Sequence, residues 1–108
     1  MELEYDYWTG NFSTVKLSLI RSISQYTRHY DSVKIGITCH PARRKNEHRK
    51  GDLKWSKMIV KYETSSVNYI NEMEKTLIDY HWEYIDNKAK GGGGPNGNQP
   101  YYLYLLLK

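Results

Sequence analysis

One carboxylate in the chain, that of Glu74, falls where its helix should be apolar. Apolar side chains recur at three- and four-residue spacing over residues 67–85, and at about 100° per residue Glu74 lies within the arc of Ile70, Leu77 and Ile78. Burial of an ionised carboxylate costs several kcal/mol unless the group meets a cation, a metal ion or several donors. A salt bridge to an arginine, or a helix turned so that Glu74 lies at its rim, would explain the position structurally. We favour a carboxylate that binds Mg²⁺, because this ion characteristically takes one or two carboxylates together with water and substrate phosphate.

A second group of candidate residues lies on a polar helix, expected over Ala42–Lys50 with Pro41 as its first residue. A short helix with almost no apolar side is seldom present for packing alone. Arg44 and His48 are four residues apart and share a face. An arginine can bind a phosphate with two hydrogen bonds and stabilise charge in a transition state, and a histidine can move a proton near neutral pH. The structural alternative is a solvated charged helix in which Arg43 pairs with Glu47; the candidates for binding nucleic acid are Arg43, Lys45, Arg49 and Lys50.

The charge distribution favours a polyanionic partner. The formal net charge is +4, and seven Lys and Arg residues lie between Arg43 and Lys57 against Glu47 and Asp52, with Lys34 on the preceding strand. Lysine and arginine contacts to phosphates release counterions, so a local positive patch promotes binding to nucleic acid.

Cysteine content and hydropathy exclude other classes of protein. A single cysteine, Cys39, excludes an intramolecular disulfide and a cysteine-based zinc site. No stretch approaches the roughly 18 apolar residues of a membrane span, and the acidic N-terminus does not resemble a signal peptide. We therefore expect a cytoplasmic protein, of a cell or of an infected host, that is a monomer or homodimer and has no membrane partner.

The hydrophobic periodicity predicts four strands that alternate with three helices. This order indicates an α+β fold, with a small mixed β-sheet flanked by helices, in a single domain over residues 1–108. His81, in the same arc as Glu74, is interpreted as a hydrogen-bonded core residue. The expected elements are a strand over 2–8, a helix from a cap at Ser13 or Thr14 to about Tyr30, a strand at Val33–Thr38, the polar helix, a strand at Lys54–Glu63, a helix from Ser65 or Ser66 to about Ile85, a glycine-rich connector over 91–98 and a strand at Tyr101–Leu107.

The residues between the second strand and the polar helix carry a resemblance to a known family. The run Val33-Lys34-Ile35-Gly36-Ile37-Thr38, followed by Pro41 and Arg43-Arg44, resembles the second half of the GIY-YIG nuclease signature. It is most similar to the viral and phage branch, in which the second tyrosine is often replaced, here by Lys34. The resemblance covers residues 33–82 and implies a catalytic arginine at Arg44, a metal-binding glutamate at Glu74 and a histidine at His48.

Two further residues of the family site have no fixed counterpart in this sequence. The first-motif tyrosine, normally about ten residues upstream, is absent there. If an inserted helix separates the two strands, Tyr5 or Tyr7 supplies it. The late asparagine of the family is assigned to Asn98, just before the last strand, in preference to Asn87 or Asn96. Lys34 takes over the work of the missing tyrosine or marks a loss of activity.

The residues and the resemblance together predict a Mg²⁺-dependent or Mn²⁺-dependent endonuclease that hydrolyses phosphodiester bonds in DNA, or in RNA. Glu74 would hold the metal, a tyrosine with His48 would help to deprotonate the attacking water, and Arg44 would neutralise charge on the phosphorus centre. The alternatives are a catalytically inactive nucleic-acid-binding module of the same fold and a protein-interaction adaptor that uses a tyrosine-rich surface. The nuclease hypothesis requires Glu74 and Arg44 to share one cleft.

Overall fold

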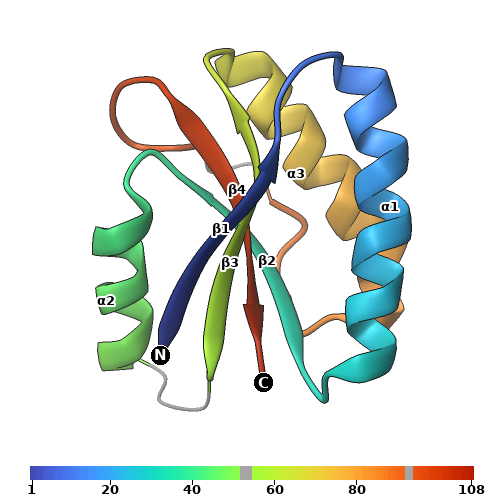
Figure 1. Cartoon of the computed structure of the whole chain (residues 1–108), viewed down its shortest axis with the longest axis vertical. Coiled ribbons are helices and arrows are strands. Elements are labelled where there is room, and N and C mark those ends of the chain that lie inside the picture. The colour runs from blue at the N-terminus through green and yellow to red at the C-terminus, as the bar shows by residue number, and fades with distance from the viewer. Residues whose placement is uncertain (52–54, 92–93) are drawn as a thin grey trace.

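A four-stranded mixed sheet with strand order β1-β3-β4-β2 forms the centre of the computed structural model, which describes residues 1–51, 55–91 and 94–108 (Figure 1). Strand β1 is parallel to β3, whereas β4 is antiparallel to both β3 and β2. The expected α+β fold with a small mixed sheet is therefore confirmed. The elements are β1 (Glu2–Trp8), α1 (Phe12–His29), β2 (Val33–Thr38), α2 (Pro41–Gly51), β3 (Lys57–Thr64), α3 (Val67–His81), the 3₁₀ helix η1 (Trp82–Tyr84) and β4 (Tyr101–Leu107).

The helices cover the two faces of the sheet unequally. In Figure 1, α1 and α3 pack on one face, and α2 lies alone on the other. The larger core lies under α1 and α3, where Leu19 and Ile70 belong to the same buried cluster as Leu105 of the sheet. A smaller apolar cluster on the α2 face contains Trp55, Met58, Val60, Tyr104 and Leu106. Strand β4 is apolar throughout because successive residues point into these two clusters.

The ends of the elements differ from the sequence-based expectations at several places. Helix α1 is capped by Asn11, whose side chain accepts the backbone N–H of Thr14 at 3.1 Å, so the expected cap at Ser13 or Thr14 is wrong. Asparagine accepts this bond as well as serine does. Ser66 caps α3 as expected, by accepting the N–H of Tyr69 at 3.1 Å. Helix α3 ends at His81 and continues as η1 rather than as an α-helix to Ile85, while the expected start of β3 at Lys54 lies outside the described residues.

The outer edge of β2 is satisfied by the segment that follows η1. The side chain of Asn87 accepts the N–H of Ile35 at 2.9 Å and donates to the Ile35 carbonyl at 2.8 Å. The backbone N–H of Asp86 donates to the Val33 carbonyl at 2.8 Å. Asn87 thus supplies hydrogen bonds that a fifth strand would otherwise provide, and it holds β2 in place without extending the sheet.

Among the helices in the described ranges, none combines the length and the apolar character that crossing a membrane would require.

We predict that Asn87→Ala destabilises the protein by about 1–3 kcal/mol, because it leaves a backbone donor and a backbone acceptor of β2 without partners. The free energy of unfolding, measured by urea denaturation, tests this. The matched control is Asn98→Ala, since Asn98 is exposed and a surface substitution of this kind changes stability by about 0.5 kcal/mol or less. Equal stability of the two variants would contradict the role given to Asn87.

Candidate active-site cleft

A cleft of about 510 Å³ runs along the outer edge of β2. Arg44 and His48 reach it from α2, and Glu74 reaches it from α3. These helices cover opposite faces of the sheet (Figure 1). The cleft extends around the outermost strand, however, so that side chains from both faces line one space. The condition that Glu74 and Arg44 share a cleft is therefore met; Lys34, Gly36, Asn87, Gly91 and Tyr104 also line it.

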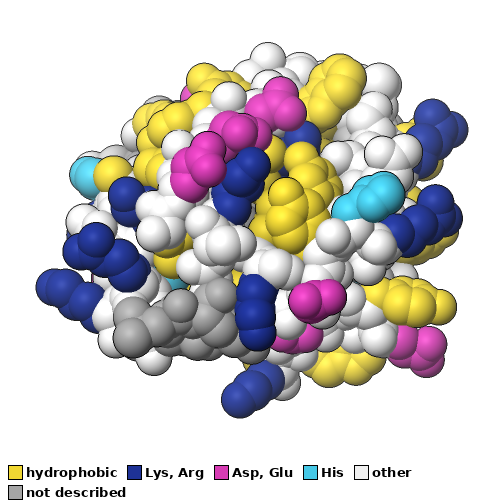
Figure 2. All heavy atoms as spheres, turned by 60° about the horizontal axis from the view of Figure 1, so that its bottom comes forward, with side chains coloured by type: hydrophobic (Ala, Val, Ile, Leu, Met, Phe, Trp, Pro, Cys, Tyr) yellow, Lys and Arg dark blue, Asp and Glu magenta, His cyan; other side chains and the backbone are white. Residues whose placement is uncertain are grey.

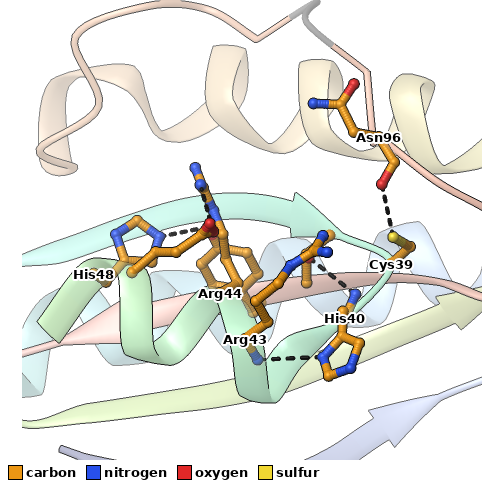
Figure 3. Close-up of polar contacts among 9 residues, drawn as sticks. Cys39, His40, Arg43, Arg44, His48 and Asn96 are labelled. Carbon is orange, nitrogen blue, oxygen red and sulfur yellow. Dashed lines mark hydrogen bonds and ion pairs between the residues drawn. The ribbon is translucent and has the colours of Figure 1, made fainter. Parts of the chain in front are cut away.

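Tyr104 on β4 is the buried centre of the α2 side of the cleft. The residue is 2% exposed, and its hydroxyl accepts a hydrogen bond from Nε of Arg44 at 3.3 Å and pairs with Nε2 of His48 at 2.7 Å. Figure 3 shows Arg44 and His48 projecting from the same side of α2, with dashed lines that mark these contacts. Because α2 has almost no apolar side and Pro41 is its buried residue, the bonds to Tyr104 help to fix the helix over the sheet.

Gly36 provides the space that Tyr104 occupies. The two residues are opposite each other in the antiparallel register of β2 and β4. A Cβ atom on Gly36 would collide with Cζ and the hydroxyl of Tyr104. The sequence predicts close approach of a backbone or a ligand at this glycine; the group that approaches is instead a side chain of the neighbouring strand.

The electrostatics of the cleft keep Tyr104 protonated. Burial raises the pKa of the Tyr104 phenol above its ordinary value, the hydrogen bond and charge of Arg44 oppose the shift, and the charge of Glu74 adds to it. The hydrogen bond to Tyr104 is the main cause that raises the pKa of Arg44. Since a guanidinium can only donate, the phenol oxygen accepts from Arg44, and it can also accept the Nε2–H of His48 in the tautomer whose Nδ1 carries no proton. The influence of Glu74 on Tyr104 indicates that both sides of the cleft share one electrostatic environment.

Glu74 lies on the inward face of α3, as the helix periodicity predicts. Its exposed fraction is 8%. Gly91 packs closely on its side chain, since a Cβ atom added to Gly91 would lie 3.0 Å from Oε1 of Glu74. Gly91 has a φ of +86°, which favours glycine.

A second oxygen lies one turn away on the same helix. Oδ1 of Asn71 is buried and has no hydrogen-bond partner among the described residues; Gly94 covers it, with a separation of 3.8 Å from an added Cβ. Carboxylate and amide oxygens are ligand types that Mg²⁺ accepts; Glu74 lines the cleft, whereas Asn71 is not among its lining residues. Within the described ranges, no group of three or more His, Cys, Asp or Glu side chains could hold a metal.

The expected positions of Tyr5 and Tyr7 in this site are wrong. Strand β1 lies at the opposite edge of the sheet, separated from β2 by β3 and β4. The strand beside β2 is β4, which brings Tyr104 next to Gly36. Sequence reasoning missed this residue, although a tyrosine in the middle of the apolar run of Tyr101–Leu107 was a usable signal, because a buried tyrosine needs a partner for its hydroxyl.

The assignment of the late asparagine to Asn98 is also wrong in position. Asn98 is exposed and does not line the cleft, whereas Asn87 does. The Asn87 amide is engaged with β2, as described above, so it supports the cleft wall. Asn96 does not line the cleft either. Its backbone carbonyl accepts a hydrogen bond from Sγ of Cys39 at 2.8 Å (Figure 3).

The basic side chains are distributed between the cleft and the surface of α2. Lys34 is half-buried on β2 and lines the cleft. Glu47 pairs with Arg44 at 3.2 Å, where the sequence had suggested Arg43; Arg43 instead donates its backbone N–H to Nδ1 of His40 at the start of α2 (Figure 3). Lys and Arg side chains gather over α2, at the left of Figure 2. Of the proposed nucleic-acid-binding residues, Arg43, Arg49 and Lys50 are exposed and Lys45 is partly buried.

His81 has the structural role that the sequence suggests. It is 2% exposed, and its ring nitrogens lie 2.9 Å from the Leu77 carbonyl and 3.1 Å from the Ile20 carbonyl. The residue thus ties α3 to α1 behind the site.

Comparison with known proteins adds no relative to this picture: no family model matches the sequence, and no curated protein or solved structure matches the chain.

We predict that Gly36→Ala destabilises the protein by about 1–3 kcal/mol, the usual cost of overpacking, because the new methyl group displaces the Tyr104 ring from its bonds to Arg44 and His48. Urea denaturation measures the change. Gly51→Ala at the end of α2 is the matched control, since a Cβ there meets nothing within 4 Å and alanine favours the helix. A loss of stability in the control but not in Gly36→Ala would contradict the packing argument.

A second prediction concerns the Tyr104 phenol. The wild type should be more stable than Tyr104→Phe by about 1 kcal/mol at neutral pH. The pKa of Tyr104 is raised in the folded state above the ordinary 10.0, so the unfolded state releases this proton first as the pH rises. The advantage of the wild type should therefore be constant below pH 10.0 and shrink above it, in urea denaturation at a series of pH values. Other tyrosines with raised pKa values are present in both proteins, so their contributions to the pH dependence cancel. An advantage of the wild type that grew at alkaline pH would contradict the raised pKa of Tyr104.

Proposed function

We propose that this protein is a Mg²⁺-dependent endonuclease of the GIY-YIG type, also served by Mn²⁺, that hydrolyses phosphodiester bonds in nucleic acid. The observation that carries the proposal is that the buried carboxylate of Glu74 and the hydrogen-bonded group of Arg44, Tyr104 and His48 line one cleft from the two faces of the sheet. The resemblance of residues 33–82 to the family signature supports the same function independently.

Each group in the cleft has a role in this reaction. Glu74 would hold the ion, which when bound would supply Lewis-acid polarisation of the scissile phosphate. Arg44 donates hydrogen bonds to a non-bridging phosphate oxygen and offsets the charge that develops there. Tyr104 and Glu47 orient the guanidinium of Arg44, because each accepts one of its hydrogen bonds.

His48 is the proton acceptor in this proposal. With Nε2–H donating to the Tyr104 oxygen, Nδ1 takes a proton from the attacking water while the water oxygen forms a bond to phosphorus, and the ester bond on the opposite side breaks. The leaving alkoxide takes its proton from solvent. Tyr104, whose raised pKa keeps it a neutral phenol, orients the imidazole through the 2.7 Å contact and does not itself act as the base.

The partner proposed with this function is nucleic acid, in the first instance DNA. The proposed location is the cytoplasm of a cell or of an infected host. The exposed Arg43, Arg49 and Lys50 on α2 lie outside the reacting centre and suit contacts to the phosphates on either side of it. All of the proposed site residues come from one copy of the chain, so the cleft is complete in a monomer.

Lys34 favours one alternative. It lines the cleft at the position where the family carries a tyrosine, and a lysine there binds a phosphate as a point charge. A module with the same cleft that holds nucleic acid without cutting it would use the basic residues and would need no metal.

Glu74→Gln is expected to lower Mg²⁺-dependent cleavage of plasmid and single-stranded DNA by at least about a hundredfold, the scale of losing one transition-state contact, while the variant stays folded. Gel electrophoresis of substrates incubated with purified protein measures cleavage. The matched control is Glu72→Gln, which changes an exposed carboxylate of the same helix and should keep wild-type activity.

The alternatives give different results in the same experiment. Metal-independent, salt-sensitive binding that survives Glu74→Gln, with no cleavage by the wild type, identifies the inactive binding module. The protein-interaction adaptor predicts no affinity for DNA or RNA at physiological salt and no cleavage, and this result overturns the proposal.

A further inference from the structure

We propose that Tyr5, Tyr7 and Tyr102, here named the tyrosine platform, stack against unpaired bases, so that the cleft receives its nucleic acid as a single strand. The inference rests on the proposed function, because it names the form of substrate that reaches the same site. It uses residues that lie outside the cleft and that the proposed reaction leaves without a role.

The platform is a row of rings across the open part of the sheet. Tyr5 and Tyr7 alternate along β1 and remain 53% and 42% exposed. The ring centroids of Tyr5 and Tyr7 are 6.5 Å apart, and those of Tyr7 and Tyr102 are 6.2 Å apart, both edge-on. In an edge-to-face pair the edge of one ring contacts a face of the other, so the three rings do not stack on one another, and the exposed parts of Tyr5 and Tyr7 stay available to a ligand.

The platform lies on the same face of the sheet as α2 and adjoins the cleft. Tyr102 packs against the apolar cluster that contains Tyr104, and the two residues are two positions apart on β4, which places them on one face about 7 Å apart. Tyr104 carries the bonds to Arg44 and His48. A strand that stacks on the platform therefore lies beside the reacting groups rather than at a remote surface.

Positive charge borders the platform. Around the axis of α2, Lys45 and Arg49 are displaced by about 100° and 140° from Arg44. Since Arg44 points to the cleft at the edge of β2 and His48, about 40° from it, contacts Tyr104 of the sheet, the flank with Lys45 and Arg49 lies on the side of α2 away from the β2 edge. Figure 2 shows the Lys and Arg side chains of α2 at the left and hydrophobic side chains between them and the acidic side chains nearer the centre.

The acidic residues of β1 do not oppose this arrangement. They alternate with the tyrosines and therefore point to the other face of the sheet, where Glu4 pairs with Lys57 at 3.6 Å and Asp6 pairs with Lys61 at 3.3 Å. Glu63 is the acidic neighbour of Tyr102, whose pKa is raised first by burial and then by this charge. A carboxylate there repels phosphate. We therefore expect the sugar-phosphate backbone of the nucleic acid to lie toward α2 and its bases to lie on the tyrosines.

The chemistry of the platform selects single strands. In a duplex the bases stack on each other and their faces are inaccessible, whereas a single strand offers every base for stacking on an aromatic ring. Such contacts contribute without sequence preference, because every base has a π-face. A basic flank alone would bind duplex and single strand alike through phosphates.

The test measures binding separately from cleavage. Fluorescence anisotropy follows the full chain carrying Glu74→Gln, without added Mg²⁺, as it binds three labelled probes of about 12 nucleotides: oligothymidylate, the corresponding duplex, and an abasic backbone of the same length. We expect oligothymidylate to bind at least about tenfold more tightly than the abasic backbone. Tyr5→Ala and Tyr7→Ala should each weaken oligothymidylate binding by about fivefold or more, and leave abasic binding unchanged.

Matched variants separate stacking from folding. Tyr7→Phe keeps the ring and should retain binding, whereas Tyr7→Leu keeps apolar contact, removes the aromatic face and should lose it. Tyr80→Ala and Tyr84→Ala change tyrosines that are 64% and 72% exposed but lie on α3 and η1, and should bind as the parent does. Circular dichroism before each titration verifies that the variant is folded.

Two outcomes keep this inference apart from the proposed function. Equal affinity for oligothymidylate and the abasic backbone, unchanged by the platform variants, overturns the platform even if the wild type cuts DNA. Tyrosine-dependent binding of single strands by a protein that cuts nothing supports the platform and overturns the nuclease.

Discussion

The contact between Tyr104 and Gly36 decides where helix α2 lies. Helix α2 has almost no apolar surface of its own, so hydrophobic burial cannot hold it against the sheet. Its position depends on polar contacts, and those of Arg44 and His48 converge on one phenol oxygen. That oxygen can reach α2 only because the residue opposite it has no side chain. A glycine on one strand and a tyrosine on the next thus act as a single structural unit.

The second constraint is that β2 must be the outermost strand. Arg44 and Glu74 belong to helices on opposite faces of the sheet, and a sheet normally separates what lies on its two sides. Only at an edge can both reach one space. An edge strand, however, exposes unpaired N–H and C=O groups. Asn87 and the backbone of Asp86 satisfy those of Ile35 and Val33 without adding a strand, which would fill the space that the cleft occupies.

These two constraints explain which features the sequence could predict. Hydrophobic periodicity is local, so it identifies the helices, the strands and the inward direction of Glu74 and His81. The order of strands in a sheet is not local. Alternation along β1 tells that Tyr5 and Tyr7 share one face of the strand, but not that β3 and β4 stand between them and Gly36. The tyrosine beside Gly36 came from the far end of the chain, and only the β2–β4 register reveals it.

The asparagines, like the tyrosines, could not be placed from local sequence patterns. Asn87 and Asn98 flank a segment rich in glycine, whose path no local pattern fixes; the chain brings Asn87 to β2 and leaves Asn98 at the surface.

The polar character of helix α2 is related to its place on the sheet. The helix has a cleft on its Arg44 flank and an open sheet surface on its Lys45 and Arg49 flank. Under the proposed function both of these surfaces would bind a polyanion, so neither flank of the helix would favour apolar residues. The lack of an apolar face, which the sequence shows as an anomaly, is then expected, and the contacts of Tyr104 hold the helix over the sheet.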